Sequence, residues 1–312
     1  MMNLSWRHFG VLAACLLVVD VHARAPELGE TLGIGELLDG SFLVVSSGGR
    51  AKEVEVPRSL FFTASSMASD GRFIVGYSDR GFTVLNQNLR PVWSRPDPPY
   101  NVIALALSAD GMQIAVAAAD LWAARWTATT WKLFTISSSR RQRDIGRFSY
   151  TRSADELVTV NWDPTGQRLV FNDKGAIRVT NVESSASRVV GMGLSPTWSP
   201  DGQWIAYRTG EGQIALMNAE TGAIDARRFG VHLASFAHWS PDLKYVFVDE
   251  ARGRLGNCMS ISKLVVYDIS NGRSRVAYDT CGHRDWYFGW IQDPKLWLSS
   301  ARSLEVAAGG DR

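Results

Sequence analysis

A short motif of tryptophan, serine, proline, aspartate and glycine recurs along this chain and constrains its fold more than any other feature. Its best copy occupies residues 198–202, close relatives begin at Trp162 and Trp239, and looser copies lie at 67–71, 107–111 and 290–294. The first residues of successive copies are 40, 55, 36, 41 and 51 positions apart. A period near 40 residues, built from short strands and turns, is the signature of a β-propeller.

The best copy predicts how one repeating unit is built. We expect strands at residues 194–199, 203–208, 213–218 and 223–229, separated by turns at 200–202, 209–212 and 219–222. Residues 203–208 alternate polar and apolar side chains, as a half-buried strand does, and proline and glycine suit the turns. Four antiparallel strands of this length make one propeller blade.

The two ends of the repeat region are each incomplete. Two strands are expected before the first full repeat, at 41–45 and 52–56, and two after the last, at 285–290 and 296–298. Together they would complete a sixth blade and remove exposed sheet edges. We therefore predict an all-β, six-bladed β-propeller over residues 26–302, with four antiparallel strands per blade and the last blade closed by N-terminal strands. Residues 303–312 are predicted to be a disordered C-terminal tail.

The motif followed by an alternating aromatic strand resembles the repeat of TolB-like β-propellers, the bacterial relatives of WD-repeat domains. The resemblance covers about residues 60–300; the copies at 67 and 107 are degenerate, and Leu243 stands where the turn glycine is usual. It implies an exported six-bladed propeller used for binding, and it implies no particular ligand.

The first 25 residues have the pattern of an export signal. Arg7 and His8 precede an apolar run at 9–19, which is too short to span a bilayer, and small residues follow it. We expect cleavage after Ala23 or Ala25 and a periplasmic or secreted protein with no transmembrane span. The alternatives are a short uncleaved anchor, a buried strand, and a lipobox at residues 12–15, in which Cys15 would carry a lipid anchor.

Charge and motif content favour a binding protein over an enzyme. The net charge is only +2, which argues against nucleic acid as a partner. The sequence has no Gly-x-Ser-x-Gly, no His-Glu-x-x-His and no phosphate-binding glycine loop. His238 and His283 are better explained as a chance pair than as a metal site. We predict a non-enzymatic protein without cofactor or metal.

Two rival functions remain open at this stage. One is a metal-dependent propeller hydrolase of lactonase-like type, and the other is a structural subunit of a cell-envelope complex. The carboxylates that would serve the hydrolase are expected near one face of the propeller: Asp97, Asp120, Asp173, Glu211, Asp249 and Asp285.

The preferred function is binding of a protein or peptide through one loop face. That face is expected to carry the connections between blades and the turns between second and third strands, and loops on a rigid scaffold are where function concentrates. Residues 137–152, rich in arginine, are read as one such connection. The alternative is a set of solvated loops with no partner. The candidate binding residues are Tyr100, Arg140, Arg141, Arg143, Arg147, Arg252, Arg254, Arg284 and Trp286.

Cys258 and Cys281 are predicted to form a disulfide. They flank an expected hairpin that turns at Asn271-Gly272, and an exported protein meets an oxidising compartment. The alternative is two unrelated thiols. A closed loop of this size stabilises the fold by roughly 3 kcal/mol in the loop-entropy model. Thiol titration of the unreduced, denatured mature protein should find no free thiol, and two reactive thiols would contradict the bridge.

Overall fold

The chain folds as antiparallel β-sheets. The computed structural model describes residues 32–36, 42–46, 51–54, 64–68, 72–78, 80–86, 90–97, 100–119, 130–149, 158–230, 234–239, 243–252 and 261–281. These residues form five four-stranded sheets and one three-stranded sheet, every strand pairing with a neighbour in sequence. The all-β prediction is confirmed. In the same part of the chain there is no helix of the length and apolar character needed to cross a membrane.

Each four-stranded sheet uses four consecutive strands. The first contains β4 (Ala64–Met67), β5 (Phe73–Ser78), β6 (Gly81–Asn86) and β7 (Pro91–Arg95). The second contains β8 (Asn101–Leu107), β9 (Gln113–Ala119), β10 (Thr130–Ser137) and β11 (Gln142–Ser149). The third contains β12 (Val160–Trp162), β13 (Arg168–Asp173), β14 (Ala176–Asn181) and β15 (Ser187–Met192).

The remaining sheets continue this pattern towards the C-terminus. The fourth contains β16 (Leu194–Trp198), β17 (Trp204–Arg208), β18 (Ile214–Asn218) and β19 (Ile224–Phe229). The fifth contains β20 (Ala234–Trp239), β21 (Tyr245–Arg252), β22 (Ile261–Asp268) and β23 (Ser274–Cys281). The strands predicted from the best motif copy therefore agree with the fourth sheet to within about one residue at each end.

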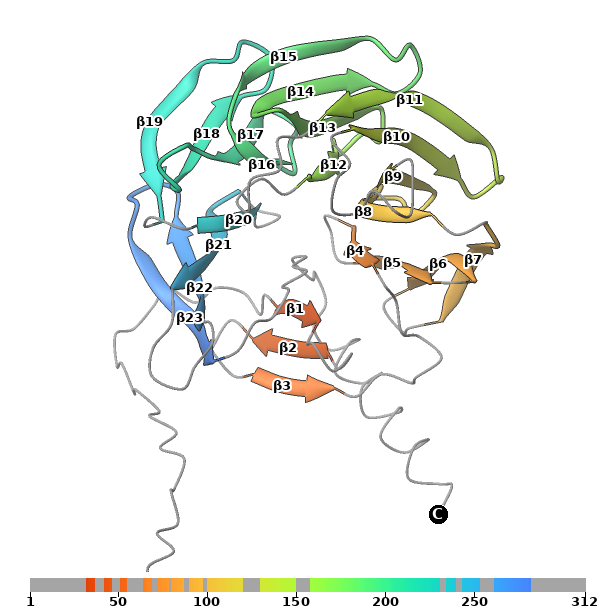
Figure 1. Ribbon diagram of the computed structural model, residues 1–312. Helices are drawn as coiled ribbons and strands as arrows, with labels where there is room; N and C mark the ends of the chain where they lie inside the picture. Colours follow the sequence, from red (N-terminus) through yellow and green to blue (C-terminus); the bar gives the residue numbers. More distant parts are fainter. Residues whose placement is uncertain are drawn as a thin grey trace, which may run out of the picture.

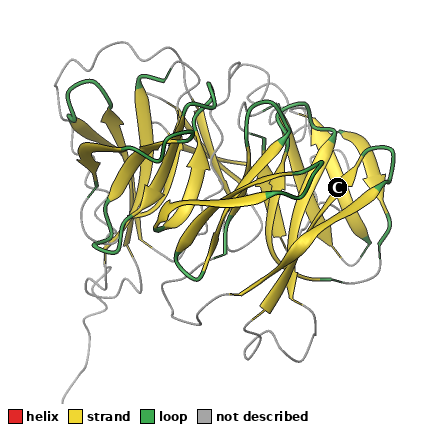
Figure 2. Ribbon diagram, turned by 90° about the horizontal axis from the view of Figure 1, so that it is seen from above, coloured by secondary structure: helices red, strands yellow, loops and turns green. Residues whose placement is uncertain are grey.

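The sheets are arranged radially around a common centre (Figure 1). The first strand of each four-stranded sheet lies innermost and the fourth lies at the rim (Figure 1). Neighbouring sheets contact each other through these inner strands, in the order β4, β8, β12, β16 and β20. The turns gather at the two ends of the strands, which gives the ring two faces (Figure 2).

The N-terminal strands form a three-stranded sheet of their own. It contains β1 (Leu32–Glu36), β2 (Phe42–Ser46) and β3 (Ala51–Val54), and it lies between the first and fifth four-stranded sheets in Figure 1. The prediction gave strands near β2 and β3 but missed β1. The C-terminal strands predicted at 285–290 and 296–298 lie outside the described residues, as do the expected signal segment and tail.

The motif tryptophans pack between neighbouring sheets. Trp162, Trp198 and Trp239 end the inner strands β12, β16 and β20, and each is buried. Trp198 lies in a core cluster that also contains Val170 and Val179 of the preceding sheet and Tyr207 of its own sheet. These tryptophans therefore hold neighbouring sheets together, because each cluster spans two sheets.

The turns after the inner strands β8, β12 and β16 are each held by a hydroxyl–carboxylate pair. Ser199 Oγ donates to Asp201 Oδ1 at 2.5 Å and accepts from the backbone N–H of Trp204 at 2.9 Å. Gly202 closes the turn with φ at 71°, a left-handed conformation that glycine adopts without strain. At the corresponding place in the fifth sheet Leu243 has φ at 62°, so the departure from glycine leaves the backbone conformation unchanged.

The copy at Asp163 makes the same bond with its partners exchanged. Here the aspartate comes first, and Thr165 Oγ1, two residues later, donates to Asp163 Oδ2 at 2.7 Å. Asp163 also accepts from the backbone N–H groups of Gln167 and Arg168, each at 2.9 Å. The recurrent carboxylates therefore order these turns.

Trp198→Ala should destabilise the protein by roughly 3–5 kcal/mol, because it removes a large side chain from a packed contact between two sheets. Chemical denaturation followed by circular dichroism measures the loss. Met192→Ala is a matched control, since Met192 is 67% exposed and its truncation should change little. Equal stability of Trp198→Ala and the parent would show that the inter-sheet contact contributes little.

Candidate functional site

The arginine-rich segment predicted to join two blades lies within a single sheet. Residues 138–141 form the turn between β10 and β11, the third and fourth strands of the second sheet. The prediction of an inter-blade connection at 137–152 is therefore wrong for residues 137–149, and residues 150–152 lie outside the described residues. Outermost strands are largely exposed, so β11 lacks the apolar alternation by which a strand is recognised in sequence.

This turn lies on the opposite face from the one predicted. The backbone N–H of Ser138 donates to the carbonyl of Met112, in the turn between the first and second strands, at 2.8 Å. The third, fourth and fifth sheets repeat this bond through Val182, Ala219 and Ile269. We call the side that carries both kinds of turn the turn face, and the other side the connection face. Arg140 and Arg141 therefore lie on the turn face.

Other candidates lie on the connection face or outside the described residues. Tyr100 lies in the connection between β7 and β8, and its ring packs 5.2 Å from that of Phe134. Burial is the main cause that raises the pKa of the Tyr100 hydroxyl. Arg252 ends β21 on this face, and only its backbone is described. The proposed single site is thus divided between two faces. Arg254, Arg284 and Trp286 lie outside the described residues.

The predicted disulfide also falls partly outside the described residues. Cys281 is the last residue of β23, with its Cα opposite that of Ile261 on β22. Cys258 is not among the described residues, so the bridge remains a prediction.

Arg143 links its sheet to the next one. It lies near the start of β11, and its guanidinium donates to the carbonyl of Glu183, in the turn between β14 and β15. Arg188 of β15 does the same to the carbonyl of Ala219, at 2.8 Å, and Arg227 of β19 to that of Ile269. Arginines of these outer strands therefore bridge successive sheets. Arg147 lies further along β11 and is exposed.

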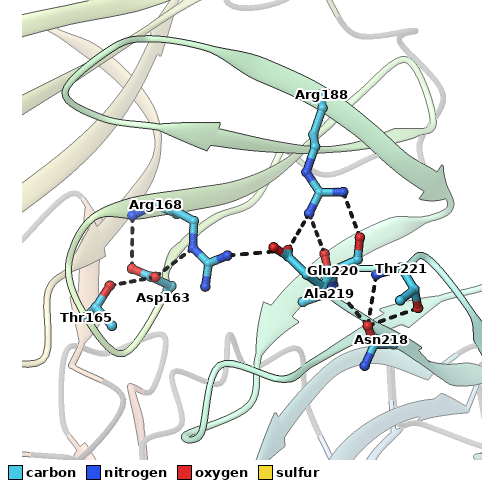
Figure 3. Close-up of polar contacts among 8 residues, drawn as sticks. All are labelled: Asp163, Thr165, Arg168, Arg188, Asn218, Ala219, Glu220 and Thr221. Atoms are coloured by element: carbon cyan, nitrogen blue, oxygen red, sulfur yellow. Dashed lines mark hydrogen bonds and ion pairs between the residues drawn. The ribbon is translucent and has the colours of Figure 1, made fainter.

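A wider polar network joins the third and fourth sheets (Figure 3). Arg168 Nε lies 2.9 Å from Asp163 Oδ2, and the Arg168 guanidinium stacks over the Trp198 ring with its central carbon 4.7 Å from the ring centroid. Arg168 Nη1 also lies 3.9 Å from Glu220 Oε2, which Arg188 Nη2 approaches to 2.9 Å. One carboxylate thus receives arginines from two strands of the neighbouring sheet.

The Asp163 carboxylate is fully engaged inside this network. Its side chain is buried, and its two oxygens accept from the Thr165 hydroxyl, the Arg168 side chain and two backbone N–H groups. A carboxylate with its lone pairs occupied in this way is suited to holding a turn and a guanidinium in place. The network is therefore a connection between sheets.

The described carboxylates of the hydrolase alternative are also engaged. Asp97 Oδ2 lies 2.8 Å from Arg95 Nε, and burial raises the pKa of Asp97 while Arg95 opposes the rise. Asp173 Oδ2 accepts from Arg178 Nε at 2.7 Å, and Asp173 Oδ1 accepts from the backbone N–H of Ser149. Glu211 lies in the turn between β17 and β18 and also makes an interaction.

The rest of that carboxylate set is not described in side-chain detail. Asp120 and Asp285 lie outside the described residues, and only the backbone of Asp249 is described. His238 is likewise described by its backbone on β20, and His283 is not described. Within the described residues, no group of three or more histidine, cysteine, aspartate or glutamate side chains is placed to hold a metal ion.

Arg140 and Arg141 differ from the bridging arginines. Both are exposed, and among the described residues neither guanidinium has a hydrogen-bond or ion-pair partner. Their backbone groups are used instead: Arg140 N–H donates to the Ser137 carbonyl at 2.7 Å, and the Arg141 carbonyl accepts from Ser137 N–H at 3.0 Å. Two cationic groups are thus presented to solvent on an ordered turn.

Comparison with known proteins gives a fold. No family model matches the chain, and no curated protein matches it. Among solved structures, TolB from Acinetobacter baumannii superposes with a TM-score of 0.56 at 14% identity, over 84% of this chain. A putative TolB from Agrobacterium tumefaciens gives 0.53 at 15%, over 85% of this chain and 99% of that one. Oligogalacturonate lyase from Vibrio parahaemolyticus gives 0.54 at 13%, over 80% of this chain and 74% of that one.

The architecture and these likenesses together define a β-propeller. More particularly, the fold is that of a TolB-like propeller, as the motif resemblance predicted. At these identities the likeness shows the fold alone. The match spans 66% of the A. baumannii TolB chain, just under two thirds of its length.

Asp163→Ala should destabilise the protein by roughly 3–5 kcal/mol, because it leaves the Arg168 guanidinium and two turn N–H groups without their buried acceptor. Glu220→Ala is the control: the Glu220 side chain is 77% exposed, so losing its ion pairs should cost about 1 kcal/mol or less. Urea denaturation of both variants tests the difference. Similar losses would contradict a special role for the buried carboxylate.

Proposed function

We propose that this protein is an exported, non-enzymatic β-propeller that binds a protein or peptide through its turn face. The binding surface is centred on the turn between β10 and β11. Export is proposed from the short apolar run at 9–19 and the small residues after it, with a periplasmic or secreted location.

The observation that carries the proposal is the contrast between two sets of arginines on one face. Arg143, Arg188 and Arg227 donate to carbonyls of the next sheet, whereas Arg140 and Arg141 have no partner among the described residues. Arginine is among the residues most enriched at binding hot spots, and its planar guanidinium matches carboxylates bidentately. The unused pair is therefore the part of this face best suited to a partner.

The proposed propeller has six blades. Five are the four-stranded sheets, and the three-stranded sheet β1–β3 supplies most of the sixth. The predicted strands near 285–298 would complete that blade by pairing with it, which joins the two ends of the chain non-covalently and protects the sheet edge.

The enzymatic alternative is a metal-dependent hydrolase acting from the connection face. A lyase shares the fold, at 13% identity. We favour binding because Asp97 and Asp173 are each already paired with an arginine. Metal analysis of the purified protein separates the two functions, since a stoichiometric transition metal would support the hydrolase.

Arg140→Glu combined with Arg141→Glu should leave the fold stable, since both side chains are exposed. Capture of partners from envelope extract should fall strongly, and more so at low salt, where exposed charges are least screened. The capture is measured by quantitative mass spectrometry against the wild-type protein. Arg143 is left unchanged because its substitution would also break the bridge to Glu183.

Arg90→Glu combined with Arg273→Glu is the matched control. Both arginines are exposed and lie in the turns between third and fourth strands of other sheets, so the change in net charge and turn type is the same. The control should retain the captured partners. Equal capture by both double variants would remove the β10–β11 turn from the binding site.

A further inference from the structure

We propose that Met112, Arg140 and Arg141 form a docking surface for a short acidic peptide segment that carries one apolar side chain. This inference rests on the proposed function and names the chemistry of the partner. We call these three residues the docking surface.

The first argument is the backbone of Arg140. Its φ is 66°, in the left-handed region where residues other than glycine are strained. The same kind of turn occurs between β17 and β18, where Thr209 N–H donates to the Gln213 carbonyl and Gly212 N–H to the Thr209 carbonyl. Gly212, with φ at 80°, occupies the place of Arg140.

The comparison shows that this turn forms without an arginine. The hydroxyl contacts also correspond: Ser137 Oγ accepts from Arg141 N–H at 3.2 Å, and Thr209 Oγ1 accepts from Gln213 N–H at 3.3 Å. An arginine at the strained position therefore contributes nothing that the turn itself requires. Strain retained at an exposed position is a reason to look for function there.

The second argument is the support beneath the two arginines. Ser138 N–H binds the Met112 carbonyl, which fixes this turn against the turn between β8 and β9. The Met112 side chain is 45% exposed on the same face. An adaptable apolar side chain thus lies on a turn that is hydrogen-bonded to the turn bearing Arg140 and Arg141, whose guanidinium groups have no partner among the described residues.

The third argument is that the paired positive charge is bordered by negative charge on one side of the turn face. Arg140 and Arg141 are adjacent, whereas the corresponding turns of the first and fifth sheets carry one exposed arginine each among the described residues, Arg90 and Arg273. The corresponding turns of the third and fourth sheets carry carboxylates, Glu183 and Glu220, and the Glu220 side chain is 77% exposed. A broad anionic surface, such as a membrane or nucleic acid, would meet these carboxylates as well as the arginines. A short acidic segment can contact Arg140 and Arg141 without extending over Glu183 and Glu220, so the charge pattern favours a peptide.

The test uses the full chain and a short fluorescein-labelled peptide in which acidic residues flank one phenylalanine. Binding is followed by fluorescence anisotropy at low and moderate salt. One companion peptide has glutamine and asparagine in place of the acids, and another has serine in place of phenylalanine. Vesicles containing anionic lipid are assayed in parallel by co-sedimentation.

Arg140→Gly should weaken binding of the acidic peptide about fivefold to tenfold, as expected for loss of a charge-assisted contact. Its melting temperature should be equal to or higher than that of the parent, because glycine relieves the strain. Ser185→Gly is the control: Ser185 is also left-handed, with φ at 55°, in the turn between β14 and β15, and its replacement should leave binding unchanged.

Met112→Ser should weaken binding of the phenylalanine peptide but not of its serine companion. The uncharged peptide should bind neither the parent nor the variants. A lower melting temperature with unchanged peptide affinity in Arg140→Gly would instead assign Arg140 a structural role. Vesicle binding that depends on Arg140, without peptide binding, would replace the peptide by an anionic membrane.

The failure of this inference is distinguishable from failure of the proposed function. If Arg140→Glu with Arg141→Glu abolishes capture of partners while the acidic peptide does not bind, the turn is a binding site and the assigned chemistry is wrong. If neither effect is seen, both proposals fail.

Discussion

The fold depends on apolar packing between neighbouring sheets, because each sheet buries its two faces against the sheets on either side of it. The tryptophan at the end of each of three inner strands makes this contact, and its position is fixed by the turn that follows. At Trp198 that turn is held by Ser199 and Asp201, and the preceding sheet adds Arg168 over the indole ring. The buried tryptophan and the ordered turn beside it are therefore needed together. This explains why their residues recur as one motif.

Position decides what an arginine does in this molecule. At the start of an outer strand, as in Arg143 and Arg188, the guanidinium reaches a carbonyl in the turn of the next sheet. On the turn itself, Arg140 has a left-handed backbone conformation, and its guanidinium has no partner among the described residues. The number of arginines in a segment therefore does not measure its capacity to bind a partner, because some of these arginines connect sheets.

The sequence predicted the parts of the fold where local chemistry and burial agree. Residues 194–229 form the four strands expected of them, since their turns contain proline, glycine or Asx residues and their middle strands are buried. The β11 strand was missed because it lies at the rim, where Ile145 is its one buried side chain, and because its many charged residues resemble a loop. That single error moved Arg140 and Arg141 to the wrong face. The strand β1 was missed because two glycines interrupt its five residues.

The pairing of turns on the turn face explains how a binding surface fits on such a scaffold. In four sheets, a backbone N–H of the outer turn donates to a carbonyl of the inner turn, so the two turns are joined by a main-chain hydrogen bond. The bond uses main-chain atoms alone, which leaves the side chains of both turns free to vary. The second sheet differs in this way from the third and fourth: where they present Glu183 and Glu220, it presents Arg140 and Arg141. A ligand would therefore distinguish one sheet from the next by side-chain charge, on a backbone framework that is the same in each.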